Sequence, residues 1–193
     1  LHELLQEWPP LPAEHAMELL DSRYGDAEVR RFAVNCLHQG RGFLTGLDDS
    51  ELVDYILQLV QVLKYEPYHD SPLARFLLHR AWTSRRVGHS LFWHLKAELH
   101  VPEIRVRYTL MLEAFLRGCA PYRSELMLQA SLERELSAVA LRVKEHKNFD
   151  TLKADLRRIP LPSNFQLPLS VSMECSGLRI EKCKFMDSKK LPL

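Results

Sequence analysis

Apolar residues recur at the three- and four-residue spacing of a helix along most of this chain. Two such runs follow one another between residues 56 and 81, with Ile56, Leu59, Val60 and Leu63 in the first and Leu73, Phe76 and Leu77 in the second. Side chains at this spacing share one face of a helix, so each run predicts an amphipathic helix with a face to bury. We expect a helical hairpin with these residues in its core.

The two runs meet at a short loop rich in polar residues and proline, from Glu66 to Pro72. The Ser71 hydroxyl can accept a hydrogen bond from a backbone N–H that has no partner in the first turn of a helix. Proline is favoured at the next position because its missing N–H would have been unpaired there. The second helix is therefore predicted to begin at Pro72.

Similar patterns predict helices in the rest of the chain, near residues 1–8, 13–20, 26–37, 86–100 and 102–117, followed by a charge-rich region over 121–158 with a break near Asn148. In residues 26–37 the apolar residues line one side, so Arg30 and Arg31 are expected to point into solvent. Asp48 or Asp49 is expected to cap the helix before the hairpin loop.

An arginine stands before an aromatic residue in three of the predicted helices, as Arg31-Phe32, Arg75-Phe76 and Arg107-Tyr108. The aromatic residues are 44 and 32 residues apart, near the roughly 40-residue period of HEAT-type helix pairs. Such pairs bury their faces against their neighbours. The predicted fold is all-α, an α-α superhelix of stacked antiparallel HEAT-like pairs, with Phe76→Ala expected to cost about 3–5 kcal/mol.

The character of the chain changes at Ile159, where prolines and serines replace the helical pattern. Leu178 to Met186 then approximates the alternation of a half-buried β-strand, whose partners we expect outside this chain. The predicted domains are a helical domain over 1–158 and a linker with a short β segment over 159–193. We call residues 159–193 the tail. Its amide protons should accordingly exchange freely with solvent, and the helices should remain stable without it.

Composition and charge argue against several classes of function for this chain. The chain holds 26 Lys and Arg against 25 Asp and Glu, a formal net charge of +1, which gives no reason to expect a nucleic acid partner. The four cysteines, Cys36, Cys119, Cys175 and Cys183, lack zinc-module spacing and are expected to be reduced and buried. Without a run of roughly 20 apolar residues or a signal peptide, a cytoplasmic setting is expected.

The histidines offer little for catalysis or metal binding. His89, His94 and His100 are five and six residues apart, so they rotate around a helix instead of aligning on one face. His69 and Asp70 could form a base and its orienting carboxylate, but no nucleophile is adjacent, and aspartate is common in turns. No catalytic residue and no metal site is expected.

Several long strings resemble the helical accessory domain of class I phosphoinositide 3-kinase catalytic subunits. They are LQLVQVLKYEPYHDSPLARFLLHRA, RRVGHSLFWHLKAELH, EWPPLPAEHAMELLD and RVRYTLMLEAFLRGC. The resemblance covers most of the chain, and residues 40–46 look like a local insertion in it. It implies that this chain is a fragment of such a subunit, with the start of the kinase N-lobe at its C-terminal end.

The string LRIEKCKFMDSKKLPL resembles the first strand and phosphate-binding loop of that kinase domain. By this resemblance Met186 would pack beside the nucleotide, and Ser188 and Lys189 would face the ATP phosphates. Hydroxyl, N–H and ammonium groups are suited to bind phosphate oxygens. The ordinary alternative is a basic turn between strands.

The resemblance also implies a parent protein that transfers the γ-phosphate of ATP to the 3-hydroxyl of phosphoinositides, with magnesium. Its expected partners are its own other domains, a regulatory or adaptor subunit and the phosphoinositide membrane, to which a cytoplasmic enzyme is recruited. This segment resembles none of the catalytic or activation loops, needs no cofactor itself and is expected to be inactive alone. The alternative is a free-standing HEAT-like protein-binding module.

Overall fold

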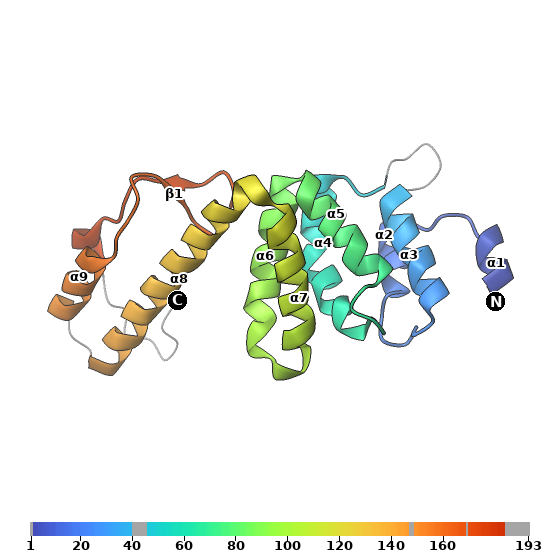
Figure 1. Ribbon diagram of the computed structural model, residues 1–193, viewed down its shortest axis with the longest axis horizontal. Coiled ribbons are helices and arrows are strands. Elements are labelled where there is room, and N and C mark those ends of the chain that lie inside the picture. The colour runs from blue at the N-terminus through green and yellow to red at the C-terminus, as the bar shows by residue number, and fades with distance from the viewer. Residues whose placement is uncertain (1, 40–45, 147–148, 169, 184–193) are drawn as a thin grey trace. The chain divides into compact units, whose positions relative to one another are not determined.

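The computed structural model describes residues 2–39, 46–146, 149–168 and 170–183, and it is predominantly helical (Figure 1). Contacts divide the chain into two compact units, one ending at Ala120 and the other beginning at Pro121. The predicted all-α class is confirmed. Among the helices that the structure describes, none combines the length and the apolar character that crossing a membrane requires.

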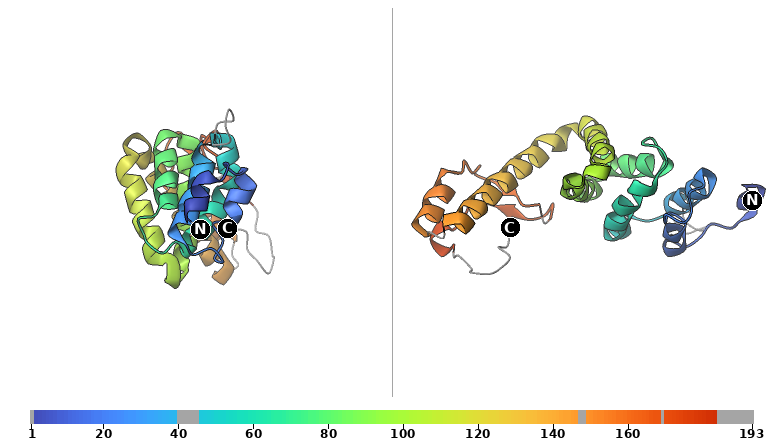
Figure 2. Two further views of the ribbon diagram at one scale, coloured as in Figure 1. Left: turned by 90° about the vertical axis from the view of Figure 1, so that its right-hand side faces the viewer. Right: turned by 90° about the horizontal axis from the view of Figure 1, so that it is seen from below.

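The first unit is a stack of helices that lie side by side (Figures 1 and 2). Its elements are α1 (His2–Glu7), α2 (Ala13–Glu18), α3 (Ala27–Gln39), α4 (Asp49–Val62), α5 (Pro72–Thr83), α6 (Arg85–Ala97) and α7 (Pro102–Gly118), with 3-10 turns η1 (Leu63–Tyr65) and η2 (Glu98–His100) after α4 and α6. Packing runs from α2 to α3, from α3 to α5, and from α5 to α7. Neighbouring helices thus bury one another's apolar faces, as a HEAT-like stack requires.

Local signals placed the helix starts correctly. The Ser71 hydroxyl accepts from the Ala74 N–H at 3.2 Å, and α5 begins at Pro72. At the start of α4, Asp48 accepts from the N–H groups of Ser50 and Glu51, and Glu51 accepts from the Asp48 N–H, which is a capping box. These contacts satisfy donors that the first helical turn leaves unpaired.

The core of the first unit includes the residues predicted from the hairpin. Leu59, Leu63, Phe76 and Leu77 are all buried. The closest packing of each hairpin arm is with α6 rather than with the other arm. Gly88 of α6 permits this, because a Cβ there would lie only 2.6 Å from the Ala81 carbonyl oxygen of α5.

The second unit has its own small core. It contains α8 (Ala120–His146) from its second residue onward, α9 (Phe149–Arg158), the strands β1 (Phe165–Gln166) and β2 (Glu174–Cys175) and the 3-10 turn η3 (Ile180–Lys182). Its buried centre is formed by Val139, Val143 and Leu156. Residues from both sides of the predicted boundary at 158/159 pack there, including Ile159 and Leu178. By its contacts, the chain divides into the two compact units between Ala120 and Pro121.

The strand predicted over Leu178 to Met186 is wrong for its described part. Ile180 to Lys182 form a 3-10 turn, and the only strands in the described residues are β1 and β2, which pair antiparallel with Phe165 opposite Cys175. Ile180 and Cys183 are three residues apart and so share a face of the turn. That face packs on the helical core, which removes the need for a partner strand. Residues 184–193 lie outside the described part, as do residues 40–45 and residues 147–148, which include the break predicted near Asn148.

An ion pair also ties the tail to α9. Glu181 accepts from Lys153 Nζ at 2.9 Å and from Arg157 Nη2 at 2.6 Å. The hydrogen bond from Lys153, followed by that from Arg157, lowers the pKa of this carboxyl. A carboxyl with a lowered folded-state pKa stabilises the folded form above its unfolded-state pKa, and the contribution is lost as the pH falls through the folded value. Acid and high salt should both loosen the tail.

Glu181→Gln is therefore expected to speed amide exchange of residues 178–183 severalfold, because both cationic partners lose the charge they contact. Hydrogen exchange followed by mass spectrometry at one pH measures this. Glu174→Gln, which changes an exposed carboxylate of the same tail, is the matched control and should leave exchange unchanged. Equal amide exchange rates in the wild-type chain and in both variants would show that apolar packing alone holds the tail. Exchange of this segment at the unprotected rate in the wild-type chain would show that it is not docked.

Candidate functional site

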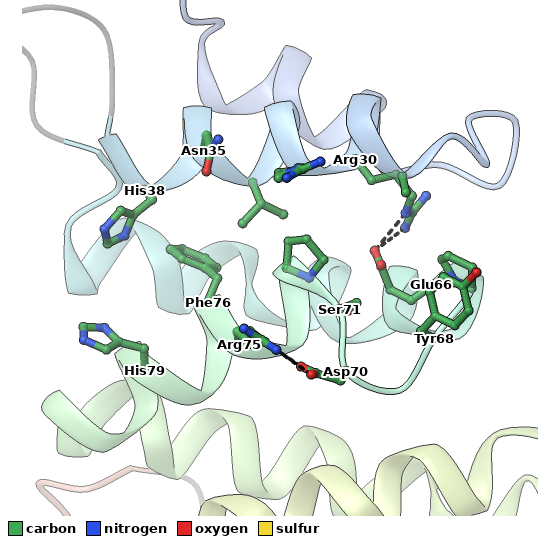
Figure 3. Close-up of a pocket in the computed structure, with 15 residues that line it drawn as sticks. Arg30, Asn35, His38, Glu66, Tyr68, Asp70, Ser71, Arg75, Phe76 and His79 are labelled. Carbon is green, nitrogen blue, oxygen red and sulfur yellow. Dashed lines mark hydrogen bonds and ion pairs between the residues drawn. The ribbon is translucent and has the colours of Figure 1, made fainter. Parts of the chain in front are cut away.

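The residues predicted to bind phosphate, Met186, Ser188 and Lys189, lie outside the described part of the chain. Their role stays a prediction. Within the described residues, hydrogen bonds from α3 and α7 converge on the loop between α4 and α5, residues 66–71, part of which is drawn in Figure 3. This α4–α5 loop and the groove beside it form the candidate site.

Arg30 fixes the loop from the α3 side. Its side chain is 1% exposed, and its Nε and Nη2 both lie 2.8 Å from Oε1 of Glu66, which is also buried. Nη1 donates to the carbonyls of Leu20 at 2.8 Å and Tyr24 at 3.1 Å. Nη2 points to the Val62 carbonyl at the end of α4. One guanidinium thus satisfies carbonyls that helix ends leave free and joins α3 to the loop.

The prediction that Arg30 points into solvent is wrong, whereas Arg31 is exposed as expected and pairs with Glu28. A signal for this was present in the sequence. Arg30 stands three, four and seven residues before Ala33, Val34 and Leu37, so it shares their buried face. The residue type predicts the opposite, because charged side chains are seldom buried without a partner. The partner, Glu66, is 36 residues away.

The same loop is held from the opposite side by α7. Arg107 donates to the Glu66 carbonyl at 2.6 Å and to the Tyr68 carbonyl at 2.8 Å. The next residue, Tyr108, is fully buried and donates its hydroxyl to the Val60 carbonyl at 2.5 Å. Burial, followed by the Glu98 charge, raises the pKa of Tyr108 to about 12, which keeps the phenol protonated as a donor. The α4–α5 loop is therefore clamped between α3 and α7.

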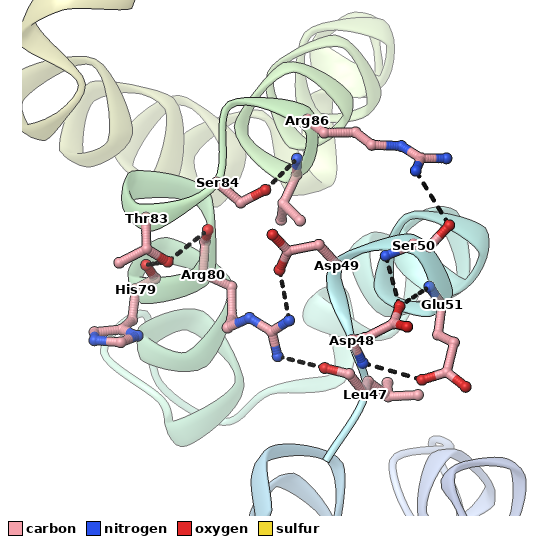
Figure 4. Close-up of polar contacts among 11 residues, drawn as sticks. Leu47, Asp48, Asp49, Ser50, Glu51, His79, Arg80, Thr83, Ser84 and Arg86 are labelled. Atoms are coloured by element: carbon pink, nitrogen blue, oxygen red, sulfur yellow. Dashed lines mark hydrogen bonds and ion pairs between the residues drawn. The ribbon is translucent and has the colours of Figure 1, made fainter. Parts of the chain in front are cut away.

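The other end of α4 is fixed by α5 and α6 (Figure 4). Arg80 donates to the Leu47 carbonyl and to Asp49 Oδ1, both at 2.7 Å. Arg86 donates to the Ser50 hydroxyl at 3.1 Å. The hydrogen bond from Arg80, and then that from Ser84, lowers the pKa of Asp49, so this carboxylate stays ionised as an acceptor. Both ends of α4 are thereby held in register with neighbouring helices.

A groove of about 600 Å³ opens beside the clamped loop, between α3 and α5 (Figure 3). We call it the α3/α5 groove. Its lining comes from α3, α5 and the loop, and we call the buried apolar part of that lining, Val34 and Phe76, the floor of the groove. His38 and His79 lie together at one end, with ring centroids 6.4 Å apart, and Tyr68 lies toward the other.

The other residues with candidate catalytic or metal-binding chemistry make ordinary local contacts. Asp70 pairs with Arg75 at 2.6 Å. Burial lowers the pKa of His94, and the His100 ring contacts the Ala97 carbonyl. Within the described ranges, no three potential metal-ligating side chains gather. The four cysteines, which all lie in described residues, form no disulfide with one another; Cys36 and Cys119 are buried, and Cys175 and Cys183 are only partly so.

Comparison with known proteins gives two findings. The sequence pattern of the phosphoinositide 3-kinase family accessory domain (PIK domain) matches residues 1–128. The chain is also 43% identical over 194 residues to phosphatidylinositol 3-kinase 2 of Dictyostelium discoideum, covering 98% of this chain and 10% of that protein. For phosphatidylinositol 3-kinase 1 of the same organism the identity is 43% over 193 residues, covering 98% and 12%. The chain spans about a tenth of the length of these curated relatives.

Proposed function

Because this chain belongs to the phosphoinositide 3-kinase family as its accessory (PIK) domain with the residues that follow it, we propose that it is the rigid scaffold of a class I catalytic subunit. The observation that carries the scaffold role is the clamped stack. Arg30, Arg107 and Arg80 tie successive helices to one another at buried or half-buried sites. A stack held in this way presents fixed surfaces to the other domains of the same kinase.

We further propose that the parent protein transfers the γ-phosphate of ATP to the 3-hydroxyl of phosphoinositides and requires magnesium. In it, Met186 would pack beside the nucleotide, and Ser188 and Lys189 would bind phosphate. Residues of α8, α9 and the described segment 178–183 pack into one core, so we propose that α8 and α9 belong structurally with the chain that leads to these residues. The proposed partners of the parent protein are a regulatory subunit and a phosphoinositide membrane. The parent enzyme would move from the cytoplasm to the plasma membrane.

Similarity over 98% of the chain favours this proposal over a free-standing helical-repeat module. The matched region continues from the first unit into the second across Ala120. Both units therefore have counterparts, in the same order, in proteins about ten times longer than their shared segment. A module that folds and acts alone would not require the second unit to follow the first.

The test is a lipid kinase assay on the longer protein encoded by the same reading frame. It should phosphorylate the 3-hydroxyl of phosphoinositide vesicles with ATP and magnesium, and Lys189→Ala in that protein should raise the KM for ATP because a phosphate contact is lost. The isolated 193-residue chain should show no turnover and no heat of ATP binding. A reading frame without kinase motifs, or turnover by the isolated chain, would contradict the proposal, and co-purification of a regulatory subunit would support class I.

A further inference from the structure

We propose that the α3/α5 groove is a docking site for a short acidic peptide segment, carrying an apolar anchor residue, from a partner protein. The proposal goes beyond the scaffold role, because it assigns a ligand to a surface within the first unit. It rests on the floor of the groove, on the charges along its rim and on the rigidity of its walls (Figure 3).

The floor supplies a seat for an apolar side chain. Val34 and Phe76 are 5% and 6% exposed and line a cavity of about 600 Å³. That volume accommodates a few side chains and is within the range of functional ligand sites. Tyr68, by contrast, is 70% exposed on the adjoining loop, where its ring can cover an incoming segment.

The charges favour an acidic ligand. Three arginines line the groove, Arg30, Arg31 and Arg75, against two carboxylates, Glu66 and Asp70. Both of these carboxylates already accept from arginine, Glu66 from Arg30 and Asp70 from Arg75. The described lining therefore holds one arginine more than it holds carboxylates, because Glu28, the partner of Arg31, lies outside it. The imidazoles of His38 and His79 add possible N–H donors at one end.

The two ion pairs in the lining, Arg30–Glu66 and Arg75–Asp70, differ in how easily the arginine can exchange its carboxylate partner. Arg30 and Glu66 are both buried, so their pair is a fixed part of the wall. The Arg75 side chain is 75% exposed and that of Asp70 is 67% exposed. Exposed pairs contribute little to stability, so Arg75 can exchange Asp70 for a carboxylate of the ligand at little cost. Arg31 can do the same, because its partner Glu28 is also exposed and stands outside the groove lining.

The walls are organised before any ligand arrives. The loop is clamped by Arg30 and Arg107, and α5 is capped by Ser71. A site whose backbone is already fixed loses less conformational entropy on binding than a flexible one, which favours a short ligand with few contacts. A groove between two helices also suits a peptide better than a flat anionic bilayer, whose surface cannot reach the recessed floor.

The experiment is selection of random peptides, about ten residues long, on the immobilised 193-residue chain. Enriched sequences should combine several Asp or Glu residues with one or two aromatic or aliphatic residues. Binding of a synthetic copy, measured by fluorescence anisotropy, should weaken at least about tenfold for Arg75→Glu and further when Arg31→Glu is added, because each change reverses a rim charge. Replacing the acidic residues of the peptide by lysine should abolish its binding to the chain.

Arg117→Glu is the matched control. Arg117 is 77% exposed and pairs with Glu113 on the same helix, as Arg75 pairs locally with Asp70, but it lies off the groove. Its reversal should leave peptide affinity within about twofold. The proposal is overturned if no acidic peptide is enriched, if Arg117→Glu weakens binding as much as Arg75→Glu, or if phosphatidylserine vesicles bind this surface in its place. Peptide binding to the chain but not to the longer protein would also overturn it, because a domain of the same protein would then fill the groove.

Discussion

Glu66→Ala is expected to lower the free energy of unfolding of the first unit by about 3–5 kcal/mol, the range for removing one partner of a buried ion pair. The change leaves the Arg30 guanidinium in a site where it is 1% exposed and has lost its only carboxylate hydrogen-bond partner in the described structure. All three tryptophans, Trp8, Trp82 and Trp93, belong to the first unit. Urea unfolding followed by tryptophan fluorescence therefore reports this unit directly.

Two further variants separate charge from packing. Glu66→Gln keeps an acceptor for Arg30 but removes the negative charge, so it should cost less than alanine. Glu113→Ala removes the partner of Arg117 in an exposed pair and should cost no more than about 0.5 kcal/mol. If Glu66→Ala costs as little as Glu113→Ala, the pair is not desolvated in solution, and the clamp on the α4–α5 loop would lose its physical basis.

Leu77→Ala is expected to destabilise the first unit by about 2–5 kcal/mol and at least as much as Phe76→Ala, although it removes fewer atoms. Leu77 is fully buried, so the vacated space stays empty and the surrounding contacts are lost. Phe76 borders the α3/α5 groove, and water can enter where its ring is removed. The cost of Phe76→Ala should therefore lie at or below about 3 kcal/mol, the lower end of the range expected from the sequence.

The same fluorescence titration in urea measures both variants. Leu110→Ala is the control, because Leu110 is an apolar residue that the stack leaves 44% exposed, and its truncation should change stability by less than about 0.5 kcal/mol. A Phe76→Ala variant clearly less stable than Leu77→Ala would mean that the groove is closed in solution. That outcome would also weaken the case for peptide docking at this site.

The sequence by itself determined the features that depend on neighbouring residues. Three- and four-residue spacing predicted the helices, and it placed Leu59, Leu63, Phe76 and Leu77 in the core, where they lie. Ser71 and Pro72 marked the start of α5. These signals can be recognised in sequence because a helix satisfies its hydrogen bonds and caps within a few residues. Long matching strings identified the family, for the separate reason that family members share residues along the chain.

Only the tertiary structure decided which residues distant in sequence meet. Arg30 is buried because Glu66, 36 residues away, supplies its charge partner, and Arg107 reaches the same residue from 41 residues away. Alternation in the tail predicted a strand, but Ile180 packs on a helical core and forms a turn. The α3/α5 groove likewise exists only where two helices and a loop meet. Helical spacing shows which face is buried, whereas the partner of that face depends on packing over the whole unit.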